Sequence, residues 1–127
     1  MRRALVRTHP WPEIIEFYRS IPWAGAMADL VQAIASSRHG AELYAATSMH
    51  TLLVTQTPEF EWEEGVLRIE PVIEGPPYRV TMFRFEFAEA QYVSERWRHT
   101  YAPDEALGAF ERFIDRAHWF VEYRTVG

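Results

Sequence analysis

The sequence contains no cysteine, no lysine and no asparagine, and all thirteen of its basic residues are arginine. The missing cysteine excludes disulfide bonds and thiol nucleophiles, and it agrees with a reducing compartment, where disulfides are rare. The missing lysine excludes Schiff-base chemistry and the phosphate-binding lysine of P-loop proteins. We attribute the absence of lysine and asparagine to genomic base composition and expect a bacterial source.

Long hydrophobic runs are also missing. No apolar stretch approaches the roughly 20 residues that a membrane-spanning helix needs, so we expect no membrane association. The N-terminus begins with basic and apolar residues as a signal peptide does, but Arg7, His9 and Pro10 interrupt the apolar stretch. We therefore expect a cytoplasmic protein.

Common catalytic signatures are missing too. The chain has no G-x-S-x-G, no H-E-x-x-H and no glycine-rich phosphate loop, and its five histidines lack the spacing of metal ligands. We therefore predict no cofactor and no metal, and we favour a non-enzymatic protein over an enzyme.

Length and charge bound the class of protein. The 127 residues suit one domain, predicted over residues 1–127, and the 48% hydrophobic and 24% charged residues are typical of a folded chain. The formal net charge of −5 argues against nucleic-acid binding, because that binding depends on neutralising phosphates. A basic protein partner is compatible with it.

Three helical segments are predicted. Residues 9–18 suit a short helix that starts through prolines, and Pro22 opens a second helix with apolar residues at helical spacing. Gly40 is the expected C-cap of the second helix. A third helix starts at Pro103, with acidic residues in its first turn, and its broad apolar stripe predicts a long helix packed on a sheet.

Between these helices the apolar residues recur with a period of two. Residues 43–48 and 49–57 are predicted to be extended, as two segments or as one bent strand. Apolar and charged residues then alternate through residues 59–70, and a Glu-Gly turn in their middle would place Phe60 opposite Ile69. This segment is the clearest hairpin prediction in the chain.

A second hairpin is predicted from residues 78–87 and 92–101. Large side chains occupy both faces of its strands, so we expect a sheet that is covered on both sides. A loop of three or four residues would place Phe83 opposite Glu95 or Arg96. Together the elements predict an α+β fold with two N-terminal helical segments, an antiparallel sheet of about five strands and a long C-terminal helix packed on the sheet. This order loosely resembles the helix-grip ligand-binding folds, although the chain is short for one.

The last helix carries a stripe of possible metal ligands on one face: Glu111, Asp115, His118 and Glu122. The stripe could hold a divalent metal, but no second helix supplies matching ligands, and we interpret it as a solvated face. Trp119 lies on the polar side of the same helix. It is a candidate anchor for a partner protein, or it folds back onto the sheet.

Arginine and aromatic residues gather on the second hairpin. Together with the last helix they supply the candidate binding residues: Arg84, Tyr92, Arg96, Trp97, Arg98, His99 and Trp119. Because Arg, Trp and Tyr are enriched in interaction hot spots, the first hypothesis is a small acidic protein-binding module, either similar to inhibitors and antitoxins or self-associating. A solvated face with cross-strand Glu–Arg pairs is the other interpretation of these arginines.

Two alternative functions stay open. The first is a small-ligand pocket between the sheet and the C-terminal helix, lined by four aromatic residues: Phe83, Phe85, Trp97 and Tyr101. The second is an enzyme that uses His50, His99 and Glu95 for acid–base chemistry. In a strand Glu95 and His99 would lie about 13 Å apart, so a third group or a substrate would have to link them.

Overall fold

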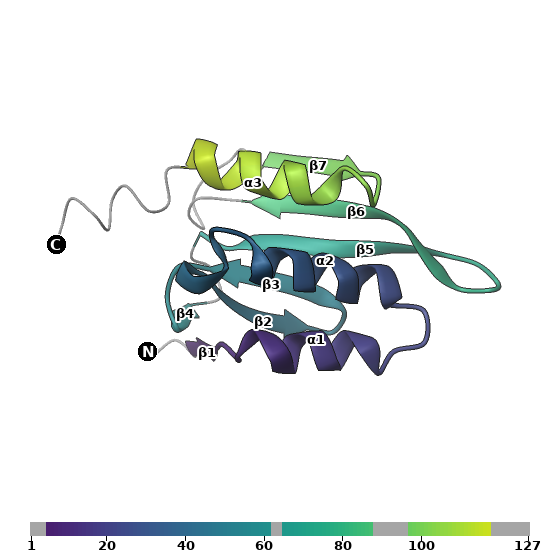
Figure 1. Ribbon diagram of the computed structural model, residues 1–127, viewed down its shortest axis with the longest axis horizontal. Helices are drawn as coiled ribbons and strands as arrows, with labels where there is room; N and C mark the ends of the chain where they lie inside the picture. The colour runs from purple at the N-terminus through teal and green to yellow at the C-terminus, as the bar shows by residue number, and fades with distance from the viewer. Residues whose placement is uncertain (1–4, 62–64, 88–96, 118–127) are drawn as a thin grey trace, which may run out of the picture.

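The computed structural model describes residues 5–61, 65–87 and 97–117. These residues form an α+β fold in which three helices pack on an antiparallel sheet of five strands (Figure 1). The strands follow the order β2-β3-β5-β6-β7, and every neighbouring pair is antiparallel. None of the described helices is long and apolar enough to cross a membrane.

The elements follow one another along the chain as β1 (Leu5–Arg7), α1 (Trp11–Arg19), α2 (Gly25–Ser36), a 3-10 turn (Gly40–Glu42), β2 (Tyr44–Ser48), β3 (Thr51–Thr55), β4 (Glu59–Glu61), β5 (Leu67–Glu74), β6 (Arg79–Phe87), β7 (Trp97–Tyr101) and α3 (Ala106–Ala117). The α+β class and the five-stranded antiparallel sheet confirm the prediction. The predicted order and helix length are wrong in part. A strand, β1, precedes the N-terminal helices, and the described part of α3 has 12 residues, the same as α2, where a long helix was predicted.

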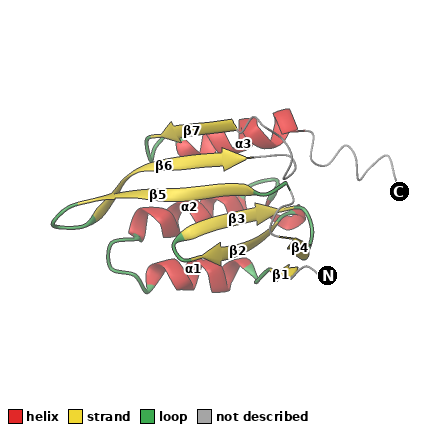
Figure 2. Ribbon diagram, turned by 180° about the vertical axis from the view of Figure 1, so that it is seen from behind, coloured by secondary structure: helices red, strands yellow, loops and turns green. Residues whose placement is uncertain are grey.

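The three helices lie on the same face of the sheet, and Figure 2 shows the sheet from the opposite side. α1 starts after Pro10 and has a second proline in its first turn, where a missing N–H costs no helical hydrogen bond. The two N-terminal helices bury their apolar residues in one core: Ile14, Tyr18, Met27, Leu30, Val31 and Ile34. The helical spacing of the apolar residues after Pro22 therefore predicted the buried face of α2 correctly.

The predicted helix cap at Gly40 is wrong. α2 ends at Ser36, and the Ser37 hydroxyl donates to the carbonyl of Ile34 at 2.7 Å. Gly40 opens the 3-10 turn instead, and a Cβ at this position would overlap the carbonyl of Ala35. The close approach of this turn to the end of α2, rather than capping, is what requires a glycine.

Two strands, not one bent strand, form between residues 44 and 55. β2 and β3 pair through a tight turn at Met49 and His50, where Met49 has a φ of 56°. The hydroxyl of Tyr18 in α1 donates to the His50 carbonyl at 3.0 Å, which ties this turn to the helices. Tyr18 is fully buried, and its desolvation raises the pKa of the hydroxyl above its usual range.

The first predicted hairpin is wrong in its pairing. β4 pairs with β1, which places Phe60 opposite Val6, whereas Ile69 in β5 lies opposite Leu52 in β3. Residues 62–64, at the predicted turn, lie outside the described residues. Phe60 is buried in a second, smaller core whose other buried members are Ala46, Leu53 and Val66. The β1–β4 pair therefore covers part of the sheet face opposite the helices, and a hairpin with β5 would not bury Phe60 there.

The second hairpin forms in a register other than the predicted one. Phe83 lies opposite Tyr101 and Phe85 lies opposite His99. The predicted register, with Phe83 opposite residue 95 or 96, is therefore wrong, because the described strands pair Phe87 with Trp97 and every other pair follows from that. Residues 88–96 lie outside the described residues.

The two faces of the β6–β7 hairpin differ from each other. The phenylalanines of β6 point toward the helices and are buried or half-buried. The opposite face carries two ion pairs, Glu70–Arg84 at 3.6 Å and Glu86–Arg98 at 2.6 Å. The expectation of a sheet covered on both sides is therefore wrong for the described part of these strands, since partly exposed charged pairs occupy the second face.

Candidate functional site

α3 begins just after the chain leaves β7. The backbone N–H of Ala102 donates to the Glu105 carboxylate at 3.2 Å, and the N–H of Ala109 donates to the Glu105 carbonyl at 3.0 Å, so Glu105 stabilises the first turn at two points. Phe110 and Ile114 are buried in the core and orient the helix. A neighbouring face of α3 then lies over β7 and presents four residues: Ala109, Arg112, Phe113 and Arg116.

Aromatic rings from the sheet lie below this face of α3. Trp97 and Tyr101 project from β7 on the side of the helices, because alternate residues of a strand share a face. The ring of Phe113 in α3 lies 5.4 Å from the Trp97 ring and 5.0 Å from the Phe87 ring, measured between centroids. These contacts hold α3 above the end of the β6–β7 hairpin.

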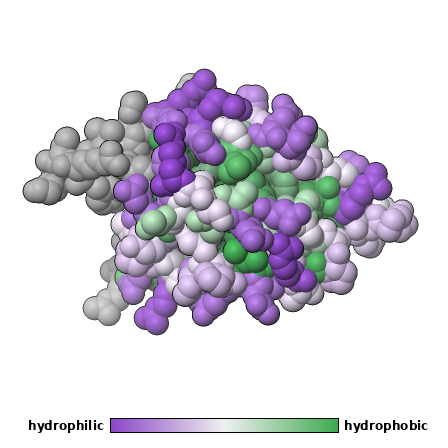
Figure 3. Space-filling model, viewed as in Figure 1, coloured by the Kyte–Doolittle hydropathy of each residue, from purple (hydrophilic) through white to green (hydrophobic). Residues whose placement is uncertain are grey.

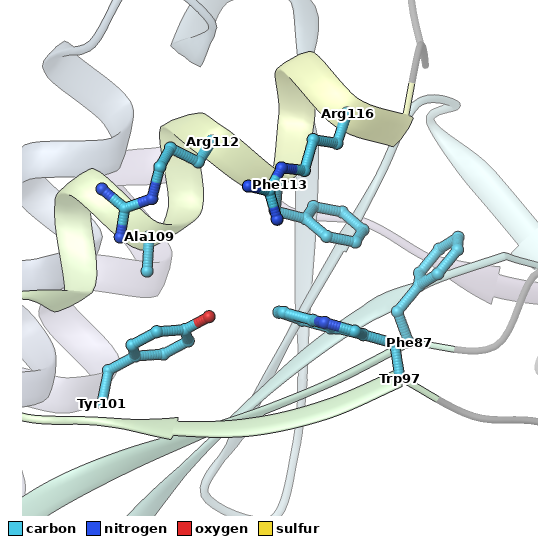
Figure 4. A pocket seen from close by; sticks show the side chains of 7 residues that line it. All are labelled: Phe87, Trp97, Tyr101, Ala109, Arg112, Phe113 and Arg116. Atoms are coloured by element: carbon cyan, nitrogen blue, oxygen red, sulfur yellow. The ribbon is translucent and has the colours of Figure 1, made fainter.

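An open groove of about 260 Å³ lies between the helix and the strand. Seven of the described residues line it: Phe87, Trp97, Tyr101, Ala109, Arg112, Phe113 and Arg116. Figure 4 shows the hydroxyl of Tyr101 and the ring of Trp97 directed into the groove from β7, and the two arginines extending over it from α3. The side of the groove formed by the sheet, called the floor below, is aromatic and consists of Phe87, Trp97 and Tyr101. The side formed by α3 carries the positive charges of Arg112 and Arg116.

The two arginines of the groove are one helical turn apart. Five other arginines of the described residues lie within 4.0 Å of a carboxylate: Arg7, Arg19, Arg38, Arg84 and Arg98. Neither Arg112 nor Arg116 belongs to any of these ion pairs. Gly108 leaves room for one of them, because a Cβ there would lie 3.2 Å from Nη1 of Arg112. Among the described residues, therefore, no carboxylate forms an ion pair with either guanidinium group.

The structure separates the residues that the sequence grouped into one binding surface. Trp97 lines the groove, whereas Arg84 and Arg98 lie on the opposite face of the sheet, each in an ion pair with a glutamate. Those ion pairs agree with the other interpretation of the arginines, a solvated face with cross-strand pairs. Exposed pairs of this kind contribute only about 0–1 kcal/mol to stability.

His99 lies on β7 beside the groove and is exposed. Its ring is nearly parallel to that of Tyr101, with the centroids 5.4 Å apart and an angle of 20° between the planes. It does not line the groove. Three further candidates lie outside the described residues: Tyr92, Arg96 and Trp119.

The groove coincides in part with the ligand pocket expected from the sequence. Trp97 and Tyr101 line it, but Phe83 and Phe85 are buried in the core. The candidate residues predicted from the sequence did not include Arg112 and Arg116. Their spacing of four residues, next to the small residues Gly108 and Ala109 at the edge of the apolar stripe, is the signal that could have identified them.

The two histidines proposed for acid–base chemistry, His50 and His99, are not brought together. His50 lies in the β2–β3 turn against Trp23, with the ring centroids 4.8 Å apart, and strands β5 and β6 separate β3 from β7. Three strand spacings therefore separate His50 from His99, a distance of roughly 14 Å or more. Glu95 lies outside the described residues.

Asp115, a member of the acidic stripe, links α3 to the end of α2. Arg38 donates to both of its carboxylate oxygens, at 3.0 and 2.9 Å, and the Nε2 atom of His39 lies 3.9 Å from one of them. Within the described ranges, no three potential metal ligands come together. His118 and Glu122, also predicted members of the stripe, lie outside these ranges.

Comparison of this chain with protein-family models, with curated proteins and with solved structures found no match. The geometry and chemistry of the groove therefore carry the functional argument.

Proposed function

We propose that this protein binds a small organic molecule in the groove between β7 and α3. The observation that carries the proposal is the combination, around one open volume of about 260 Å³, of four aromatic side chains and two arginines that form no ion pair with a described residue. Pockets for drug-sized ligands measure about 300–1,000 Å³ and are lined mainly by apolar and aromatic groups with a few polar ones. A groove of this size suits a compound of one or two rings.

The surface around the groove favours a compact site over a broad interface. On the face that carries the helices, hydrophobic patches are small and separated by hydrophilic side chains (Figure 3). Among the residues that the structure describes, the exposed large hydrophobic ones lie on different elements and turns: Leu5, Tyr44, Met49, Ile73 and Tyr78. Protein interfaces more often use one contiguous apolar patch of several hundred Å².

Filling the groove is expected to remove ligand binding. Ala109→Leu adds three carbon atoms to a buried residue that lines the groove, and we expect at least about a tenfold loss of affinity for compounds that stack on its floor. The measurement is a titration, followed by NMR, with a panel of neutral and charged aromatic compounds of one or two rings. In the unmodified protein the shifts should centre on the aromatic residues of the groove: Phe87, Trp97, Tyr101 and Phe113.

The matched control is Ala41→Leu. Ala41 lines a second hollow of about 390 Å³ beside Trp11 and Tyr44, remote in sequence from β7 and α3, and we expect this substitution to leave binding unchanged. Shifts centred on the second hollow, or equal losses in the two variants, would contradict the proposal. If Ala109→Leu does not fold, the position of the shifts in the unmodified protein still decides between the two hollows.

Protein binding through β7 is a second candidate function. β7 is an edge strand, and its three central residues, Arg98, His99 and Thr100, are exposed. An edge strand presents backbone groups that a strand from another chain can pair with. If the partner is a second copy of this chain, the mass measured by light scattering should rise toward that of a dimer with concentration, whereas a constant monomer mass up to about 1 mM would exclude self-association of useful affinity.

A further inference from the structure

We infer, on the basis of the proposed function, that the ligand of the groove is an aromatic anion: a flat compound of one or two rings with one acidic group, stacked on the floor and held by Arg112 and Arg116. The observation behind this is local charge. The chain as a whole is acidic, with a net charge of −5, yet the lining of the groove, as far as the structure describes it, includes two arginines and no carboxylate.

The position of the two arginines suits a single acidic group. Residues four apart on a helix have Cβ atoms about 5–6 Å from each other, so both guanidinium groups can reach the same oxyanion. Two positive charges at this spacing repel one another, and a bound anion would relieve the repulsion. Arg112 and Arg116 differ in this from the arginines on the opposite sheet face, whose charges are already matched by Glu70 and Glu86.

The carboxylate that neighbours Arg116 in the described part of α3 is engaged by another arginine. Asp115 precedes Arg116 in α3, but both of its oxygens accept hydrogen bonds from Arg38 at the end of α2. The Gly108 position, which lacks a Cβ, leaves the end of the Arg112 side chain free to adjust. Guanidinium groups bind carboxylates and related oxyanions through paired, charge-assisted hydrogen bonds, which are stronger than neutral ones.

The floor supplies the second half of the recognition. Trp97 and Tyr101 offer ring faces and edges for a flat ligand from the sheet, and Phe113 adds a ring from α3. The Tyr101 hydroxyl, which Figure 4 shows pointing into the groove, can donate or accept one more hydrogen bond. A ligand with its ring on this floor and its acidic group toward α3 would contact the aromatic side chains and the two arginines at the same time. A neutral ring of the same shape would meet only the floor.

The test compares 2-naphthoate with 2-naphthamide, which have nearly the same shape and differ in charge. We expect the unmodified protein to bind the carboxylate at least about tenfold more tightly, since the charge-assisted bonds form only with the anion. The double variant R112Q/R116Q should lose this preference while its affinity for the amide stays within about twofold, because glutamine is a good helix former and leaves the floor in place. Isothermal titration at low salt gives the four dissociation constants.

The control is the double variant R84Q/R98Q, which removes the same total charge from the opposite face of the sheet. It should keep the preference for the carboxylate, and an equal loss in both double variants would show that net charge rather than the groove is responsible. If the unmodified protein binds the two compounds equally well, the inference that the ligand is an anion is wrong, but the proposed function is not contradicted. If neither compound binds and the wider aromatic panel also fails, the proposed function falls as well.

Discussion

Phe85→Ala is expected to lower the free energy of unfolding by about 3–5 kcal/mol, the range for a fully buried phenylalanine. Phe85 lies in the middle of β6, between Ile69 of β5 and His99 of β7, and is completely buried. Its ring centroid lies 5.0 Å from that of Tyr101 and 6.5 Å from that of Trp97. The substitution would therefore leave a cavity between the main core and the floor of the groove.

Urea denaturation measures this loss, and Phe87→Ala is the matched control. Phe87 lies two residues further along the same strand, is only half-buried, and lines the groove. Its truncation removes less buried area, so we expect a loss of roughly 1–2 kcal/mol. Since small domains have a total stability of about 5–15 kcal/mol, the two variants should differ clearly in their unfolding midpoints. Equal losses would mean that Phe85 is not the central packing residue of this sheet.

Stability is also expected to fall steeply above about pH 10 because of Tyr18. Burial raises the pKa of the Tyr18 hydroxyl above the usual tyrosine value of about 10. Below that pH the hydroxyl is protonated in both states, so its contribution to stability is fully present. Above it the unfolded chain loses the proton and the folded chain keeps it, so unfolding becomes easier by about 1.4 kcal/mol per pH unit until the folded pKa is reached.

The absence of lysine makes this effect measurable, since no ammonium group titrates in the same pH range. Tyr18→Phe should cost about 1 kcal/mol at pH 7, through the lost hydrogen bond to His50, and should flatten the fall in stability between about pH 10 and 12. Tyr78→Phe is the control, because the Tyr78 side chain is 65% exposed near the tip of the β5–β6 hairpin. A fall as steep in Tyr18→Phe as in the unmodified protein would contradict the assignment.

Local patterns predicted the elements well. Prolines at its start identified α1, and helical spacing identified α2 together with most of its buried residues. A period of two identified the strands around residues 44–55, 59–61, 67–70 and 79–87. These patterns succeed because one side of each element is buried and the other is not, so apolar residues recur in the sequence with the period of the helix or strand.

Strand partners could not be predicted in the same way. The alternation in residues 59–70 suited a hairpin, yet Phe60 pairs opposite Val6, more than fifty residues earlier in the chain. A pairing of this kind depends on which apolar faces are still uncovered after the rest of the sheet has formed. The back of β2 and β3, with Ala46 and Leu53, is such a face, and Phe60 covers it.

The candidate site, too, was predictable from the sequence only in part. The sequence by itself determined that the second hairpin is rich in aromatic and arginine residues, and that a helix with an apolar stripe follows it. Only the tertiary structure decided which arginines share a space with the aromatic residues. The register of β6 and β7 turns Arg84 and Arg98 toward glutamates on one face and Trp97 toward the helices on the other, while the packing of α3 brings its own arginines over Trp97. Side chains distant in sequence meet only after strand register and helix position are set, because a shift of one residue in a strand moves every side chain to the opposite face.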